Sequence, residues 1–129
     1  MIILTIRTDK PEAELGLYEG DKQLDYETWE AHRQLAETLH IKLRDLLGGQ
    51  GLALQQLGGI IVYRGPGSFT GLRIGLSVAN ALAYSLGISI VAEADDWIER
   101  GIQRLAAGES DKIVLPEYGQ PADVTTPRK

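Results

Sequence analysis

The sequence predicts an α/β fold in which helices pack on a mixed sheet of five strands. Short apolar runs of strand length alternate with long segments whose apolar residues recur at helical spacing. Glycine-rich turns separate these segments, and the sequence contains no internal repeat. At 129 residues, this pattern is typical of one domain with helices packed on a sheet.

The predicted elements follow the order βββαβαβα. Apolar and alternating runs predict strands at residues 2–6, 14–18, 23–28, 59–63 and 88–91. Helical periodicity predicts helices at residues 31–47, 70–86 and 94–107, which end at Gly48, Gly87 and Gly108. Residues 19–22 are typical of a hairpin turn. We also expect a short last strand at residues 112–115 and, because of the prolines that follow, an extended tail from Pro116.

Composition excludes several classes of protein. The net charge of −5 argues against a chain whose main surface binds RNA, since nucleic-acid binders generally carry a basic field. Without cysteine, the chain has no disulfide, thiolate metal site or cysteine nucleophile. His32 and His40 lie about 12 Å apart along one predicted helix and cannot share a metal ion. No apolar run reaches membrane length, and we expect a cytoplasmic protein without a cofactor.

The most distinctive segment is a glycine-dense run at residues 64–75, where a predicted strand meets a predicted helix. Such junctions often hold phosphates, because unpaired N–H groups at a helix start carry partial positive charge. Each standard motif nevertheless fails. No lysine follows the glycines as in a P-loop, and Gly71 comes one residue late for a dinucleotide fingerprint. Pro66 stands where the esterase elbow requires glycine.

Two interpretations of this turn are open. In the first, Pro66 and the glycines only shape a tight turn, and Ser68 or Thr70 caps the helix that follows. In the second, the turn binds a phosphate or a similar anion through Gly65, Gly67, Ser68 and Thr70.

The predicted helix at residues 70–86 also carries a ridge of small residues at a spacing of four. Glycine inside a helix costs up to about 1 kcal/mol relative to alanine, so this ridge needs compensation from packing. It packs either on the chain's own sheet and other long helix or against another subunit. We predict that it is an uncovered association surface through which the isolated chain forms a homodimer. The residues of this predicted interface are Leu35, Leu39, Gly71, Leu72, Gly75, Leu76, Ala79 and Ala83.

The unbroken run Gly-Pro-Gly-Ser-Phe-Thr-Gly-Leu-Arg-Ile-Gly at residues 65–75 resembles the signature of the bacterial TsaB (YeaZ) family. That family is the scaffold subunit of tRNA threonylcarbamoyladenosine (t6A) biosynthesis. The resemblance covers residues 30–93 well, and residues 116–124 resemble the family's closing tail. It implies one half-domain of the actin- and hexokinase-like (ASKHA) fold at residues 1–115 and an extended tail at 116–129, with most of a second half-domain absent.

One residue departs from the family pattern at the end of the first strand. The family usually has Ile-Asp-Thr there, whereas this chain has Arg7 in place of the carboxylate. An arginine cannot coordinate magnesium, so this departure argues against nucleotide hydrolysis by the usual route of the fold. Asp9 lies two residues further on, at the end of the strand.

The resemblance implies a non-catalytic scaffold that pairs with the TsaD-type catalytic subunit through the helices at residues 31–47 and 70–86. It also implies a TsaE-type ATPase as a further partner and only indirect contact with tRNA. The alternative function is a small nucleotide- or phosphate-binding enzyme that uses the loop at residues 65–71. A self-associating remnant that has lost its partner is a third interpretation.

Overall fold

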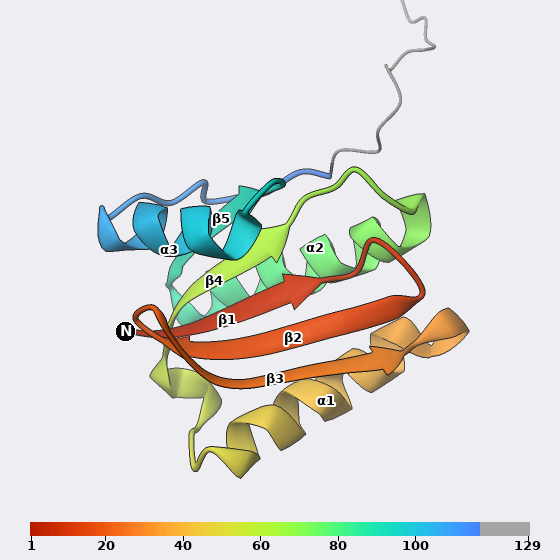
Figure 1. The fold of residues 1–129 in the computed structure, drawn as a ribbon, viewed down its shortest axis with the longest axis horizontal. Helices are drawn as coiled ribbons and strands as arrows, with labels where there is room; N and C mark the ends of the chain where they lie inside the picture. The colour runs from red at the N-terminus through yellow and green to blue at the C-terminus, as the bar shows by residue number, and fades with distance from the viewer. Residues whose placement is uncertain (117–129) are drawn as a thin grey trace, which may run out of the picture.

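The structure is a computed structural model that describes residues 1–116. Its elements follow the predicted order (Figure 1). The strands are β1 (Ile2–Arg7), β2 (Glu12–Glu19), β3 (Lys22–Glu30), β4 (Leu57–Tyr63) and β5 (Ser89–Glu93). The helices are α1 (Leu35–Gly49), α2 (Phe69–Leu86) and α3 (Trp97–Ala106), with short 3-10 turns η1 (His32–Gln34) and η2 (Leu54–Gln56). The predicted tail lies outside the described residues, apart from Pro116.

The sheet is mixed, as predicted, with the strand order β3-β2-β1-β4-β5. β1 pairs antiparallel with β2 and parallel with β4, while β2–β3 is an antiparallel hairpin and β4–β5 a parallel pair. α2 lies behind the sheet and α3 in front of it in Figure 1. α1 contacts β2, β3 and α2, so the two long helices share one face of the sheet. None of the helices among residues 1–116 has the length and hydropathy that a membrane crossing requires.

The core lies around the two central strands, which helices cover most completely. Ile60, Ile61 and Val62 of β4 are fully buried, because α2 packs on one face of this strand and α3 on the other. A strand buried on both faces shows a continuous apolar run instead of alternation, which is the pattern of residues 59–63. From the helix side, Leu72 and Leu76 of α2 complete this core.

Two helices begin later than their sequence pattern predicts. α1 begins at Leu35 instead of residue 31, because residues 32–34 form a tighter 3-10 turn. α3 begins at Trp97 instead of residue 94, since Asp96 has a left-handed backbone with φ of 51° that a helix cannot contain. The predicted end of α2 is confirmed: Gly87 follows it with φ of 67°.

The strand predicted at residues 112–115 is wrong, because side chains take over the pairing that a sixth strand would provide. At the outer edge of β5, the Ile90 N–H donates to Ser110 Oγ (3.2 Å) and the Ala92 N–H donates to Asp111 Oδ2 (2.9 Å). The chain then turns towards α2, where the Asn80 amide donates to the Val114 carbonyl (3.0 Å) and accepts from its N–H (2.9 Å). These contacts satisfy the strand edge without a strand.

Arg104 of α3 holds this terminal segment in place. Its guanidinium donates to Glu93 Oε2 (3.1 Å), to Glu109 Oε1 (2.8 Å) and to both carboxylate oxygens of Asp111. Burial alone would raise the pKa of Asp111, but the hydrogen bonds from Arg104 and from the Ala92 N–H lower it below its usual value. One cation therefore joins α3, β5 and the segment after α3.

Replacing Arg104 with methionine should lower the free energy of unfolding at neutral pH by about 1 to 2 kcal/mol, because solvent partly screens these charged hydrogen bonds. The folded pKa of Asp111 is depressed, so its contribution is present above the ordinary Asp range and is lost as the pH falls through the folded pKa. Denaturant unfolding should therefore show that the difference in free energy of unfolding between the wild type and Arg104→Met is smaller below about pH 4 than at neutral pH. Arg100→Met, on the exposed side of the same helix, is the control. A difference that does not change with pH would contradict the role of Asp111.

Candidate functional site

The glycine-dense turn lies between β4 and α2 and packs against the end of β1. The Ser68 N–H donates to the Asp9 carbonyl (2.9 Å), and Thr8 Oγ1 donates to the Gly71 carbonyl (2.8 Å). Thr8 is one of two buried polar side chains in the described residues. The first turns of α2 are therefore hydrogen-bonded directly to the chain that leaves β1.

Three glycines are required by this close approach. A Cβ on Gly67 would lie 2.3 Å from the Asp9 Cβ, and one on Gly71 would lie 2.2 Å from the Thr8 carbonyl oxygen. A Cβ on Gly75 would lie 2.0 Å from Thr8 Oγ1. Because real side chains do not approach so closely, these contacts favour the interpretation in which the glycines shape the turn.

The four residues of the predicted anion site do not share one environment. Gly65 is buried and Gly67 half-buried, whereas Ser68 and Thr70 are exposed. Ser68 is the N-cap residue of α2, but its side chain makes no capping hydrogen bond, so the predicted Ser68 cap is wrong. Anion binding at this turn stays a prediction, although Asp9 places a carboxylate next to it.

Arg7 occupies the position where the family resemblance would place a carboxylate. Its guanidinium donates to both carboxylate oxygens of Asp9, at 2.8 and 3.1 Å, and stacks on the Tyr63 ring with 3.9 Å to the centroid. The hydrogen bond to Asp9 raises the pKa of Arg7 further above its usual value. The cluster ties the end of β1 to the end of β4, and it pairs the Asp9 carboxylate with a cation.

A second polar cluster, on β2 and β3, was not visible in the sequence. The Tyr26 hydroxyl donates to Glu14 Oε1 (2.5 Å). The ammonium of Lys10 donates to the other carboxylate oxygen of Glu14, Oε2 (2.9 Å). Burial and the neighbouring carboxylate both raise the pKa of Tyr26, so this phenol stays protonated. These residues meet because of strand register, which no local motif signals. Among residues 1–116, no group of three or more His, Cys, Asp and Glu side chains could hold a metal ion.

The predicted small-residue ridge faces inward, so the expectation that it is uncovered is wrong. The glycines of the ridge contact Thr8, and its alanines pack in the core beside the leucines. Seven of the eight predicted interface residues are buried within this chain, and Gly71 is half-buried; the buried ones are Leu35, Leu39, Leu72, Gly75, Leu76, Ala79 and Ala83. The sheet and the two long helices cover each other more fully than the size of the domain suggests.

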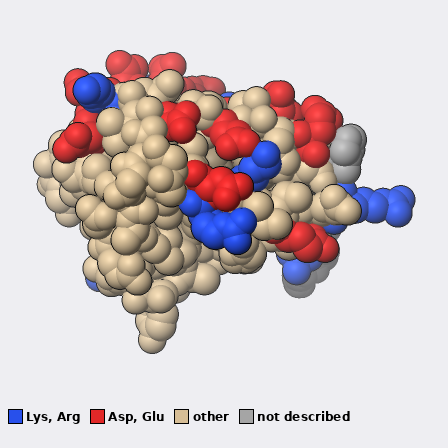
Figure 2. All heavy atoms as spheres, turned by 90° about the horizontal axis from the view of Figure 1, so that it is seen from below, with Lys and Arg blue, Asp and Glu red and all other residues tan. Residues whose placement is uncertain are grey.

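The exposed ridge of α2 lies two positions away and consists of Arg73, Ser77, Ala81 and Ser85, all exposed. Arg73 is the only charged residue of α2, and no charged residue occurs between Asp45 and Arg64. Figure 2, which shows the molecule from below, has a broad surface at its lower left that is nearly free of Lys, Arg, Asp and Glu. The exposed side of α2 thus presents a small-residue ridge with one charged side chain, whereas α1 carries Glu37, Lys42, Arg44 and Asp45.

An apolar cavity adjoins this ridge on the side of α1. Its volume is about 420 Å³, and it lies between α1, η2 and α2. Most of its lining is apolar, but two polar side chains also contribute: the lining residues are His40, Leu43, Arg44, Leu47, Gly48, Leu52, Leu54 and Leu82. We call the exposed ridge of α2 together with this cavity the α1–α2 seam.

The sequence comparisons match the part of the chain that builds this seam. The model of the TsaD family, described as tRNA N6-adenosine threonylcarbamoyltransferase, matches residues 29–93, which is half of the chain. The chain belongs to this family. The matched range contains α1, β4 and α2 in full.

The relatives indicate a protein of the TsaB (YeaZ) type. The chain is 48% identical over 50 residues to the tRNA threonylcarbamoyladenosine biosynthesis protein TsaB of Bacillus subtilis, covering 39% of this chain and 22% of the relative. It is 34% identical over 89 residues to the tRNA N6-adenosine threonylcarbamoyltransferase of Pyrobaculum neutrophilum, and this match covers 69% of this chain and 26% of the relative. The solved structure of YeaZ from Pseudomonas aeruginosa superimposes with a TM-score of 0.67 at 31% identity. The superposition covers 72% of this chain and 43% of the YeaZ chain.

These likenesses confirm the predicted fold class, an actin- and hexokinase-like α/β fold with a mixed sheet. The chain spans less than half of the length of the relatives it matches. The predicted division into a half-domain at residues 1–115 and a tail at 116–129 stays a prediction.

Replacing Gly71 with alanine should destabilise the fold by about 2 kcal/mol or more, because the new methyl group overlaps the rigid Thr8 backbone. Gly48→Ala is the matched control: a Cβ there meets no atom within 4 Å. The control should be neutral or stabilising by up to about 1 kcal/mol, as expected for alanine within a helix. Thermal and denaturant unfolding of both variants measure the contrast. Equal effects would show that α2 does not depend on its close approach to Thr8.

Proposed function

We propose that the chain is a non-catalytic scaffold subunit of tRNA t6A biosynthesis and pairs with a TsaD-type catalytic subunit through the α1–α2 seam. The observation that carries this proposal is the position of the family match: residues 29–93 are the part that forms the seam. The name of the B. subtilis relative, a tRNA threonylcarbamoyladenosine biosynthesis protein, supports the same pathway. Contact with tRNA is then indirect, in keeping with a net charge of −5, and the proposed location is the cytoplasm.

The chemistry of the seam suits a helical partner. Small side chains at Ser77, Ala81 and Ser85 allow another helix to approach to about 8–10 Å between axes. The cavity between α1 and α2 offers a largely apolar pocket for one apolar side chain of the partner, the kind of contact that carries most of the energy of an interface. In the absence of that partner, two copies of the chain would pair through the same seam, and a TsaE-type ATPase would join the complex elsewhere.

The polar groups at the end of β1 already bind one another within the chain. This favours the scaffold role over a nucleotide-binding enzyme. Arg7 and Asp9 neutralise each other at the end of β1. The turn that would have to hold phosphates packs instead against Thr8 and Asp9. These contacts leave no charged group of this cluster available for a nucleotide.

Ala81→Glu should weaken binding to the TsaD-type subunit of the same organism by about tenfold or more, or about 1.4 kcal/mol. The carboxylate would lie on the small-residue ridge and would have to be desolvated by the partner helix. Ala106→Glu, at an alanine of α3 that is also exposed, is the control and should bind as the wild type does. Calorimetric titration with both subunits purified, and unfolding curves to confirm the folds, provide the measurement. Unchanged binding by Ala81→Glu would place the interface elsewhere.

Calorimetry with ATP and Mg²⁺ discriminates between the two proposed functions. The scaffold should show no binding tighter than about 10 μM, which corresponds to roughly 7 kcal/mol. Binding tighter than that, weakened by Gly67→Ala or Thr70→Ala in a variant that stays folded, would favour the small nucleotide-binding enzyme instead.

A further inference from the structure

The segment that follows α3 lies along the outer edge of β5, and we call its residues 109–114 the strap. The Asp111 N–H donates to the Ile90 carbonyl (2.7 Å), and the Ile90 N–H donates to Ser110 Oγ (3.2 Å). The Ala92 N–H donates to Asp111 Oδ2 (2.9 Å). The strap therefore already occupies the backbone groups of β5 with which a further strand would pair.

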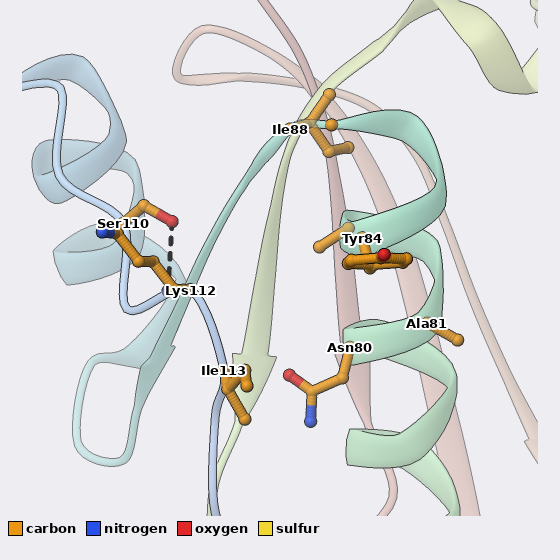
Figure 3. Close-up of a pocket in the computed structure, with 9 residues that line it drawn as sticks. Asn80, Ala81, Tyr84, Ile88, Ser110, Lys112 and Ile113 are labelled. Carbon is orange, nitrogen blue, oxygen red and sulfur yellow. Dashed lines mark hydrogen bonds between the residues drawn. The ribbon is translucent and has the colours of Figure 1, made fainter.

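The strap has little buried apolar surface of its own. Residues 109–113 are exposed, and Val114 is the one buried residue of the strap. An open groove of about 530 Å³ separates the strap from the C-terminal half of α2, and Ile113 lines this groove while 70% exposed (Figure 3). A segment with few buried apolar contacts and solvent-exposed hydrogen bonds opens at a lower free-energy cost than the core does. We therefore expect the strap to open before the rest of the domain.

Two side chains from outside the strap hold it in place. The Asn80 amide of α2 donates to the Val114 carbonyl (3.0 Å) and accepts from the Val114 N–H (2.9 Å). Figure 3 shows this amide extending from α2 towards the strap. At the other end, the Arg104 guanidinium of α3 donates to both carboxylate oxygens of Asp111. Val114 can be buried because Asn80 satisfies both of its backbone groups, so the strap depends on this one amide.

Between these two attachments the backbone of the strap is strained. Lys112 has a φ of 67°, in the left-handed region that lysine rarely adopts. The Ile113 N–H donates to the Asp111 carbonyl (2.7 Å), and the Lys112 N–H donates to Ser110 Oγ (3.2 Å; Figure 3). Such strain persists only where the surrounding contacts impose it. Opening of the strap would relieve it.

The edge that the strap covers suits pairing with an identical strand. Ile90, Val91 and Ala92 form an uncharged run, and the backbone groups that point outward belong to Ile90 and Ala92. If two β5 strands pair antiparallel about Val91, Ile90 of each copy lies opposite Ala92 of the other and the two exchange hydrogen bonds. Ser89 then lies opposite Glu93, so no like charges meet. β3, at the other edge of the sheet, is instead rich in charged side chains, which disfavour such pairing.

We propose that the strap is a removable cover of β5. While Asn80 and Arg104 hold it, the edge of the sheet is closed. When it is released, β5 pairs antiparallel with β5 of a second copy of this chain, and the two sheets become one. This device goes beyond the scaffold function proposed above, because it involves the edge of the sheet instead of the α1–α2 seam and requires no TsaD-type subunit.

Hydrogen exchange of the full chain tests the attachment of the strap. Asn80→Ala removes both hydrogen bonds to Val114 and suits a helix, so the amides of Ile90 and Ala92 should exchange about tenfold faster or more. The amide of Leu4, in the core strand β1, should exchange as in the wild type. Val114→Ala, which weakens the attachment without a change in α2, should give the same pattern and is the second variant.

Ser85→Ala, at an exposed position of α2, is the matched control and should change none of these rates. Unchanged exchange of Ile90 and Ala92 in both Asn80→Ala and Val114→Ala would overturn the role of the strap. A rise at Leu4 as large as that at Ile90 would show that the strap opens only with the whole domain, and would overturn it as well.

Sedimentation of the chain alone tests the pairing of β5. Asn80→Ala should self-associate about tenfold more tightly than the wild type, or about 1.4 kcal/mol. In the same background, Ser89→Glu places two carboxylates opposite each other and should reverse this gain, whereas Ser89→Lys faces Glu93 and should preserve or increase it. Equal association of Asn80→Ala and the wild type, or equal effects of the two Ser89 substitutions, would show that β5 does not take a second copy. Pairing through the seam would respond to Ala81→Glu and not to the charge at Ser89, so such a failure leaves the proposed function standing.

Discussion

The close approach of α2 to the end of β1 is the contact on which the rest of this structure depends. Gly71 and Gly75 let the helix touch Thr8, whose hydroxyl donates to the Gly71 carbonyl at 2.8 Å. This contact fixes the rotation of α2 about its own axis. Since residues four apart share one side of a helix, the whole ridge that contains these glycines must then face the sheet. The ridge two positions away, with Ser77 and Ala81, faces outward and is available to a partner.

The same contact explains why a motif that resembles a phosphate-binding turn serves packing here. A helix start beside a glycine-rich turn has the geometry of an anion site. In this chain the Ser68 N–H already donates to the Asp9 carbonyl, and the Asp9 carboxylate is paired with Arg7. The end of β1 is therefore internally satisfied. Such an arrangement suits a domain that offers its helices to another subunit.

α2 also lies between the cavity beside α1 and the segment that follows α3. On one side it borders the seam with α1, and on the other it faces the segment that Asn80 and Arg104 hold against the sheet edge. This segment covers the edge of β5 with side-chain hydrogen bonds and one backbone hydrogen bond instead of a strand, which protects this edge of the sheet from pairing with another chain. The exposed ridge of α2 then offers a partner a helical surface with one charged side chain, Arg73.

The sequence by itself determined the order of the elements, the hairpin, the end of α2 at Gly87 and the family, because each of these depends on neighbouring residues. Apolar periodicity and a glycine with positive φ act locally. The tertiary structure alone decided which side of α2 is buried, why residues 112–115 are not a strand, and how Tyr26 meets Glu14. Each of these depends on the register of distant segments. A small-residue ridge fits a sheet as well as another helix, and only the position of Thr8 selects the sheet.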